Sequence, residues 1–186
     1  MEFLEMVERR RSTRSFTDEK VYVEDTEKII HAALLAPSSK NTQSSSFMIV
    51  EDKGVIGRMS EMRDYGSAFM AGAPLVILVL GDERLSDLWR INASISASYL
   101  QLAAESMGLG SCWVHVDGRP HLKDEPDGMT AEEYLKEFIP VPEGMRIMCA
   151  VAVGHPAGTV TPVPKKVRSE SERVMILDGM QSISGE

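Results

Sequence analysis

The chain has 186 residues, of which 43% are hydrophobic, so we expect one domain over residues 1–186 with a sizeable core. Its formal net charge of -8 and pI near 5.1 argue against sequence-independent binding to nucleic acid or to an anionic membrane. The sequence has two cysteines, no signal-peptide pattern at its start, and no apolar run near the roughly 20 residues of a membrane span. These features favour a soluble protein of the reducing cytoplasm.

Apolar periodicity in the first half of the chain predicts helices and strands in alternation. We expect a helix over residues 2–10, and a second that has Asp25 or Thr26 as its N-cap and ends before Pro37. The elements expected next are a strand over residues 47–51, a short helix over residues 55–62 and a buried strand over residues 75–80.

The longest predicted element is a helix over residues 87–108, which is apolar around most of its circumference. Such a helix is either central to the fold or shared across a dimer interface. The alternation of elements is too irregular for a βαβ series, so we expect an α+β sandwich. The remaining expected elements are a strand over residues 111–116, a loop over 117–129, a capped helix over 130–138 and a strand over 145–153.

Two basic clusters and one polar loop are the candidate binding elements. The loop, residues 37–43, lies between a helix and a strand, as binding loops often do, with a plain surface turn as the alternative. In an acidic chain the basic clusters suggest a site for a phosphate dianion, with two solvated faces as the alternative. They comprise Arg9, Arg10, Arg11 and Arg14 near the start, and Lys165, Lys166 and Arg168 near the end.

Other chemistries find little support in the sequence. Cys112 and His115 would point to opposite faces of a strand, and Cys149 and His155 offer no matching pair, so we expect no metal site. Residues 108–113 lack the glycine pattern of a nucleophile elbow or of a dinucleotide fingerprint. Without an evident nucleophile or base, the sequence points to an enzyme whose cofactor carries the chemistry.

Five segments, in order, resemble the FMN-dependent nitroreductases. Residues 10–16 (Arg-Arg-Ser-Thr-Arg-Ser-Phe) look like that family's Arg-x-Ser-x-Arg/Lys-x-Phe signature, and residues 36–43 (Ala-Pro-Ser-Ser-Lys-Asn-Thr-Gln) look like its Ala-Pro-Ser-Ser-x-Asn-x-Gln loop. Residues 108–114 (Gly-Leu-Gly-Ser-Cys-Trp-Val) are similar to its Gly-Leu-Gly-Thr-Cys-Trp-Ile segment. Residues 139–156 and the late Lys-Val-Arg at 166–168 match more loosely.

The resemblance implies a fold and a set of binding residues. The fold is a nitroreductase-like sandwich, a central, mostly antiparallel sheet with helices on both faces, in an interlocked homodimer with two FMN sites at its interface. The tail at residues 169–186 is then a candidate contact of the partner subunit. The implied FMN ligands are Arg10, Arg11, Ser12 and Arg14 of one subunit, Pro37, Ser38, Ser39, Asn41 and Gln43 of the other, the backbones of Val114 and His115, and Lys166 and Arg168 at the phosphate.

The resemblance also implies an activity, in which NAD(P)H gives hydride to flavin N5 and a nitroaromatic, quinone or similar acceptor takes the electrons. Arg14 would stabilise the reduced flavin electrostatically, and no protein side chain is expected to be catalytic. One departure is the stretch Ser44-Ser-Ser-Phe47, where the family has Pro-Trp/Tyr-x-Phe. It motivates one alternative, a non-catalytic flavin-binding protein. A related flavin enzyme such as a reductive dehalogenase is a further alternative, which no residue of the sequence selects.

Overall fold

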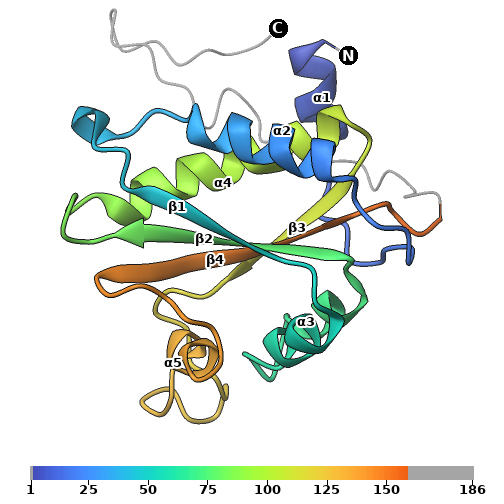
Figure 1. The fold of residues 1–186 in the computed structure, drawn as a ribbon. Coiled ribbons are helices and arrows are strands. Elements are labelled where there is room, and N and C mark those ends of the chain that lie inside the picture. The colour runs from blue at the N-terminus through green and yellow to red at the C-terminus, as the bar shows by residue number, and fades with distance from the viewer. Residues whose placement is uncertain (1, 159–186) are drawn as a thin grey trace, which may run out of the picture.

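A four-stranded sheet with strand order β1-β2-β4-β3 organises the chain (Figure 1). The computed structural model describes residues 2–158, and all three strand pairings in it are antiparallel. The prediction of a mostly antiparallel sheet is therefore confirmed. The strands are β1 (Ser45–Val50), β2 (Leu75–Asp82), β3 (Gly110–His115) and β4 (Met145–Gly154).

Helices cover both faces of this sheet, as the predicted sandwich requires. Figure 1 shows α2 (Val23–Leu34) and α4 (Trp89–Ser106) packed side by side on one face, with α1 (Phe3–Arg9) at the end of this layer. The helices α3 (Lys53–Ser60) and α5 (Ala131–Lys136) lie on the opposite face. Two short 3-10 helices, η1 (Ser39–Asn41) and η2 (Ala68–Gly72), complete the described elements.

The central strand β2 separates two hydrophobic cores. Its eight residues are all buried, because helices pack on both of its faces. Leu75, Ile77 and Val79 belong to the core under α2 and α4, whereas the alternate residues Val76 and Leu78 belong to the core on the α3 and α5 side. This two-sided burial explains why the strand is a continuous aliphatic run.

Side-chain caps mark the starts of two helices, α3 and α5. Asp52 caps α3 by accepting the Val55 N–H at 2.9 Å, and Thr130 forms the predicted capping box of α5 with Glu133. The predicted cap of the second helix is wrong, because α2 begins at Val23, before both proposed capping residues. Asp25 instead pairs with Lys28, and Thr26 donates back to the Tyr22 carbonyl. None of the described helices is long and apolar enough to cross a bilayer.

Candidate functional site

The basic segment after α1 is fastened along the start of edge strand β3. The Thr13 N–H donates to the Ser111 carbonyl at 2.9 Å, and Ser12 forms an isolated parallel bridge with Ser111. Thr13 lies so close to Gly110 that a Cβ there would be 2.6 Å from the threonine hydroxyl. A glycine at position 110 is thus what allows the segment to lie against the strand.

Arg10, Ser12 and Arg14 converge around one side chain of β3. Burial raises the pKa of the Cys112 thiol, while the positive charges of Arg14 and Arg10 and a hydrogen bond with Ser12 oppose that rise. Within residues 2–158, neither arginine forms an ion pair with a carboxylate, although Arg14 lies 5.9 Å from the centre of the Phe69 ring. Two guanidinium groups without a carboxylate partner, which act on the same thiol as the Ser12 hydroxyl, are donors of the kind that binds a phosphate group.

Arg11, predicted from the same signature, is directed elsewhere. Its Nη1 donates to the carbonyls of Glu8, Arg9 and Arg10, so the guanidinium caps the C-terminal end of α1. Its Nε is buried and has no partner in the described part of the chain. A cavity of about 410 Å³ adjoins this group and is also lined by Thr13, Glu105 and Gly110. Arg11 as an FMN ligand stays a prediction.

The polar loop at residues 37–43 is attached to the start of α4. The side-chain oxygen of Asn92 accepts the Ser39 N–H at 2.9 Å, and Ser38 Oγ accepts the Gln43 N–H at 2.9 Å. The side chains of the predicted ligands Pro37, Asn41 and Gln43 are exposed. Asn92 is not among the residues predicted from the sequence, although it occupies the buried stripe of α4, three residues after Trp89 and four before Ser96.

The two predicted ligands at the end of β3 are placed differently. Val114 is buried and pairs with Ala150 inside the sheet, whereas the His115 carbonyl accepts a hydrogen bond from Arg63 Nη1 at 3.3 Å. The His115 ring stacks on Trp113, with centroids 6.1 Å apart. Burial lowers the pKa of His115, and the nearby Arg119 charge lowers it further, which favours the uncharged ring.

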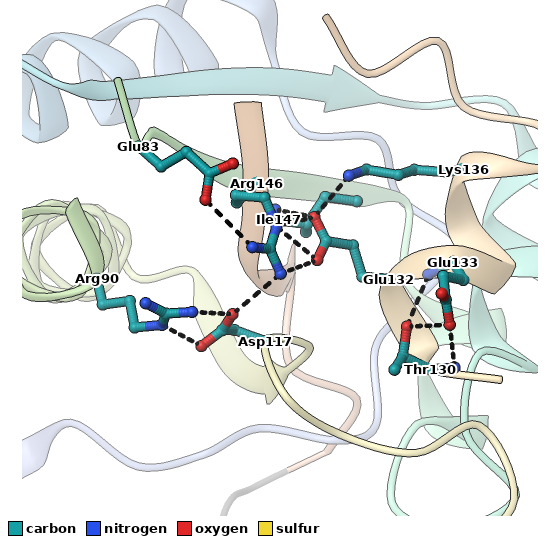
Figure 2. Close-up of polar contacts among 9 residues, drawn as sticks. All are labelled: Glu83, Arg90, Asp117, Thr130, Glu132, Glu133, Lys136, Arg146 and Ile147. Atoms are coloured by element: carbon teal, nitrogen blue, oxygen red, sulfur yellow. Dashed lines mark hydrogen bonds and ion pairs between the residues drawn. The ribbon is translucent and has the colours of Figure 1, made fainter. Parts of the chain in front are cut away.

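An ion-pair network fixes the start of the loop at residues 117–129 (Figure 2). Asp117 Oδ2 lies 2.7 Å from Arg90 Nε of α4, and Asp117 Oδ1 lies 3.8 Å from Arg146 Nη2 of β4. Arg146 also binds Glu132 Oε2 at 2.8 Å, and Glu132 Oε1 binds Lys136 Nζ at 2.9 Å. These contacts join α4, α5 and β4 to the loop.

The middle of this loop is fixed as well. His121 Nδ1 lies 3.0 Å from the Met62 carbonyl, and the ring stacks on Tyr134 with centroids 4.5 Å apart. The backbone N–H of Asp64 donates to the His121 carbonyl, and the Lys123 N–H donates to the Asp64 carboxylate. The loop is therefore packed against the ends of α3 and α5.

Comparison with known proteins identifies the family. The model of the nitroreductase family matches residues 7–63 and 53–155. An Archaeoglobus fulgidus protein with the provisional name NADH dehydrogenase/NAD(P)H nitroreductase is 35% identical over 83% of this chain and 86% of its own length. The chain belongs to the nitroreductase family. The prediction made from the five segments is confirmed.

Two further similarities concern the fold of the nitroreductase family and a relative that is named for a different activity. The solved structure of an FMN-dependent nitroreductase from Clostridium difficile superposes with a TM-score of 0.82, with 34% identity over 94% of this chain and 99% of that one. An iodotyrosine deiodinase from Thermotoga neapolitana is 30% identical over 89% of this chain and 93% of its length. The expected nitroreductase-like fold is confirmed, and the chain is an oxidoreductase of this family.

In this member of the nitroreductase family the predicted ligands form two groups at different places on the sheet. Arg10, Ser12 and Arg14 lie along β3, whereas residues 37–43 precede β1 at the opposite edge (Figure 1). Through the strand pairing, Ser111 lies level with Leu75 of β2, and Ser45 lies level with Gly81. The two groups are thus separated by about 14 Å across the sheet and about 20 Å along it.

The rest of the predicted site falls outside this arrangement. Lys166 and Arg168 lie outside the described residues. Residues 2–158 contain no group of three His, Cys, Asp or Glu side chains placed to hold a metal ion.

Proposed function

We propose that this chain is an FMN-dependent oxidoreductase that takes electrons from NAD(P)H and passes them to a nitroaromatic, quinone or similar small acceptor. The observation that carries the proposal is the convergence of Arg10, Ser12 and Arg14 at the edge of β3, with both guanidinium groups free of carboxylates in the described residues. The names of the relatives agree with it, since they include an NAD(P)H nitroreductase and an FMN-dependent nitroreductase.

Each part of the chain has a role in this proposal. Arg10 and Ser12 bind the FMN phosphate, and Arg14 places a positive charge beside the part of the ring system that becomes negative on reduction. When bound, FMN would supply the redox chemistry, the transfer of electrons from NAD(P)H to the acceptor. The lowered pKa of His115 disfavours a second positive charge at its end of β3. Lys166 and Arg168 are proposed to complete the phosphate site.

The proposal includes a homodimer, because the two groups of ligands lie too far apart to meet in one chain. The outer face of α4 supports this assembly, since Ile91 and Tyr99 are 54% and 41% exposed there. The small residues Ser94 and Ser98 lie between them along the helix, where a second helix could approach closely. A second copy on this face would bury the apolar stripe and would bring its own residues 37–43 toward the basic segment.

A halogenated aromatic is the second candidate acceptor. The similarity to the Thermotoga neapolitana iodotyrosine deiodinase favours it, because it extends over most of both chains. The stretch from Ser44 to Ser46 also lacks the aromatic residue and the proline that the nitroreductase motif has there. Of these serines, Ser45 lines a cavity together with Ser38 and Gln43, and the absence of a ring at this position is compatible with a different acceptor.

A flavin spectrum followed by an electron-donor screen tests these proposals. We expect the purified chain to bind FMN in a one-to-one ratio and its absorbance to bleach when NADH or NADPH is added without oxygen. Nitroaromatic, quinone and iodinated phenol acceptors are then mixed with the reduced protein. A protein that binds no added FMN would overturn the proposal, and bound flavin that neither donor reduces would favour a non-catalytic flavin-binding protein.

A further inference from the structure

The loop that carries Ser38, Ser39 and Asn41 has a backbone conformation that its sequence does not favour. Lys40, Asn41 and Gln43 have φ angles of 52°, 53° and 48°, in the left-handed region. Side chains disfavour this region, and among these three residues only asparagine visits it readily. Such a conformation persists where surrounding contacts hold it.

The buried amide of Asn92 supplies those contacts. Its Oδ1 accepts the Ser39 N–H at 2.9 Å, before the left-handed residues in the chain. Its Nδ2 donates to Ser44 Oγ at 2.9 Å, after them, and lies 3.3 Å from Thr42 Oγ1 and 3.4 Å from Ser86 Oγ. One side chain therefore joins the two ends of the turn.

The orientation of this amide is fixed by chemistry. A backbone N–H can only donate, so the atom facing Ser39 must be the amide oxygen, and the amide nitrogen must face the hydroxyl groups. Asn92 and Ser44 are each 1% exposed, so water does not compete for these bonds. The Ser44 carbonyl also accepts the Asp82 N–H at 2.8 Å, which fastens the end of the loop to β2.

The helix itself gives no reason for an asparagine at this position. The buried stripe of α4 also contains Ala93, Ala97 and Leu100, and asparagine is a weaker helix former than alanine or leucine. A buried amide is unfavourable unless it is hydrogen-bonded, and here its partners belong to the loop and to Ser86.

We propose that Asn92 is a positioning residue of the flavin site, which holds residues 38–43 in the conformation that presents Ser38, Ser39 and Asn41 to FMN. The inference rests on the proposed function. A loop that must first be ordered reduces the population of chains ready to bind, and the apparent affinity falls by the same fraction. Asn92 thus affects FMN binding without touching FMN.

Titration of the full-length chain with FMN tests this role. Asn92→Ala removes both halves of the amide and should raise the FMN Kd about tenfold or more. Asn92→Asp keeps the acceptor for the Ser39 N–H, and the hydroxyls of Ser44 and Thr42 can rotate to donate to it. Because its carboxylate is buried without a cation, this variant should recover only part of the affinity that Asn92→Ala loses. Ser44→Ala removes only one of the partners of Asn92 and should raise the FMN Kd about threefold. This milder variant can be measured even if Asn92→Ala does not fold.

A matched control separates positioning from general stability. Ala104→Gly lowers the stability of the same helix about three turns away and should leave the FMN Kd within about twofold of the wild-type value. In the flavin-free chain, hydrogen exchange of the Ser39 amide should be faster in Asn92→Ala than in the wild type or in Ala104→Gly.

The outcomes are separable. Unchanged FMN affinity and unchanged Ser39 exchange in Asn92→Ala would overturn the positioning role, as would an equal loss of affinity in Ala104→Gly at equal stability. A wild-type chain that binds no FMN would defeat the proposed function and with it the flavin part of this role, whereas the exchange comparison would still show whether Asn92 holds the loop.

Discussion

Arg90 in the first turn of α4 and Asp117 just after β3 form a hydrogen-bonded ion pair, with Nε and Oδ2 2.7 Å apart (Figure 2). Two residues further along the helix, Asn92 binds Ser39 in the loop that precedes β1. β1 and β3 are the two edges of the sheet. The start of α4 therefore holds one segment at each edge, and changes there should loosen both.

Loss of the Asp117 carboxylate should destabilise the loop at residues 117–129. Asp117→Ala leaves Arg90 without its partner and removes the weaker contact with Arg146. We expect the free energy of unfolding in urea to fall by about 1–2 kcal/mol. The loss is no larger because about half of the Arg90 side chain is exposed to solvent. Limited proteolysis should cut the loop faster. The exposed Asp127 of the same loop is the control, and Asp127→Ala should stay within about 0.5 kcal/mol of the wild type.

The buried carboxylate of Glu132 should make stability depend on pH. Burial raises its pKa, but hydrogen bonds from Arg146, Lys136 and the Ile147 N–H outweigh burial, so the net pKa is lowered from 4.5. A group with a lowered folded-state pKa stabilises the protein above its unfolded pKa and loses that effect as the pH falls through the folded value. Stability should therefore decline as the pH falls below about 4.5.

Urea unfolding of Glu132→Gln at several pH values checks this dependence. At pH 7 the variant should be about 2–3 kcal/mol less stable than the wild type, because a buried charged hydrogen-bond acceptor is lost. The difference should shrink below pH 4.5. The exposed Glu137, also near α5, provides the control Glu137→Gln. A constant difference between wild type and Glu132→Gln at all pH values would contradict the assignment.

The three arginines of the N-terminal signature should behave differently when each is replaced by alanine. Arg10→Ala and Arg14→Ala should each weaken FMN binding by about 1.5–3 kcal/mol, because each removes a charge-assisted contact. Arg168→Ala, from the other basic cluster, should have an effect of the same size. Arg11→Ala should mainly lower stability, because Arg11 caps α1. Fluorescence titration with FMN and thermal unfolding of each variant measure the two effects.

Arg58→Ala is the control for the loss of one positive charge, since Arg58 stacks on Phe138 away from the basic segment. It should leave FMN affinity unchanged. If Arg11→Ala lost as much affinity as Arg10→Ala with no loss of stability, the capping role of Arg11 would be refuted.

The sequence predicted those parts of the fold that depend on local patterns. The aliphatic run of β2 and the Thr130 capping box are local signals, and the structure has both. The contact between Asn92 and Ser39 joins residues 53 apart in the chain, so no local pattern could predict it. The carbonyls that Arg11 binds are one to three residues away, but the resemblance assigned this arginine to FMN and not to the end of α1. The cap of α2 failed for a related reason, since the Thr26 hydroxyl can also bond backward to Tyr22.

Because the backbone at Lys40 is left-handed, we expect substitutions at this exposed site to change the free energy of unfolding in an unusual order. Because its φ is 52° and its side chain is exposed, packing contributes little and the backbone decides the outcome. Lys40→Gly relieves the left-handed strain and should raise the free energy of unfolding by up to about 1 kcal/mol, even though glycine frees the unfolded chain. Lys40→Val should lower it by about 1–2 kcal/mol, because a β-branched residue tolerates positive φ poorly.

The exposed Lys20, whose φ is not positive, should show the reverse order. There, Lys20→Gly should lower stability by about 0.5–1 kcal/mol, because it gives the unfolded chain more freedom, and Lys20→Val should be close to neutral. Urea unfolding of the four variants shows whether each substitution raises or lowers the free energy of unfolding. The test depends on that sign and not on the small size of each change. If glycine destabilises at both positions by the same amount, residue 40 is not left-handed in solution, and the conformation that Asn92 is proposed to hold does not exist.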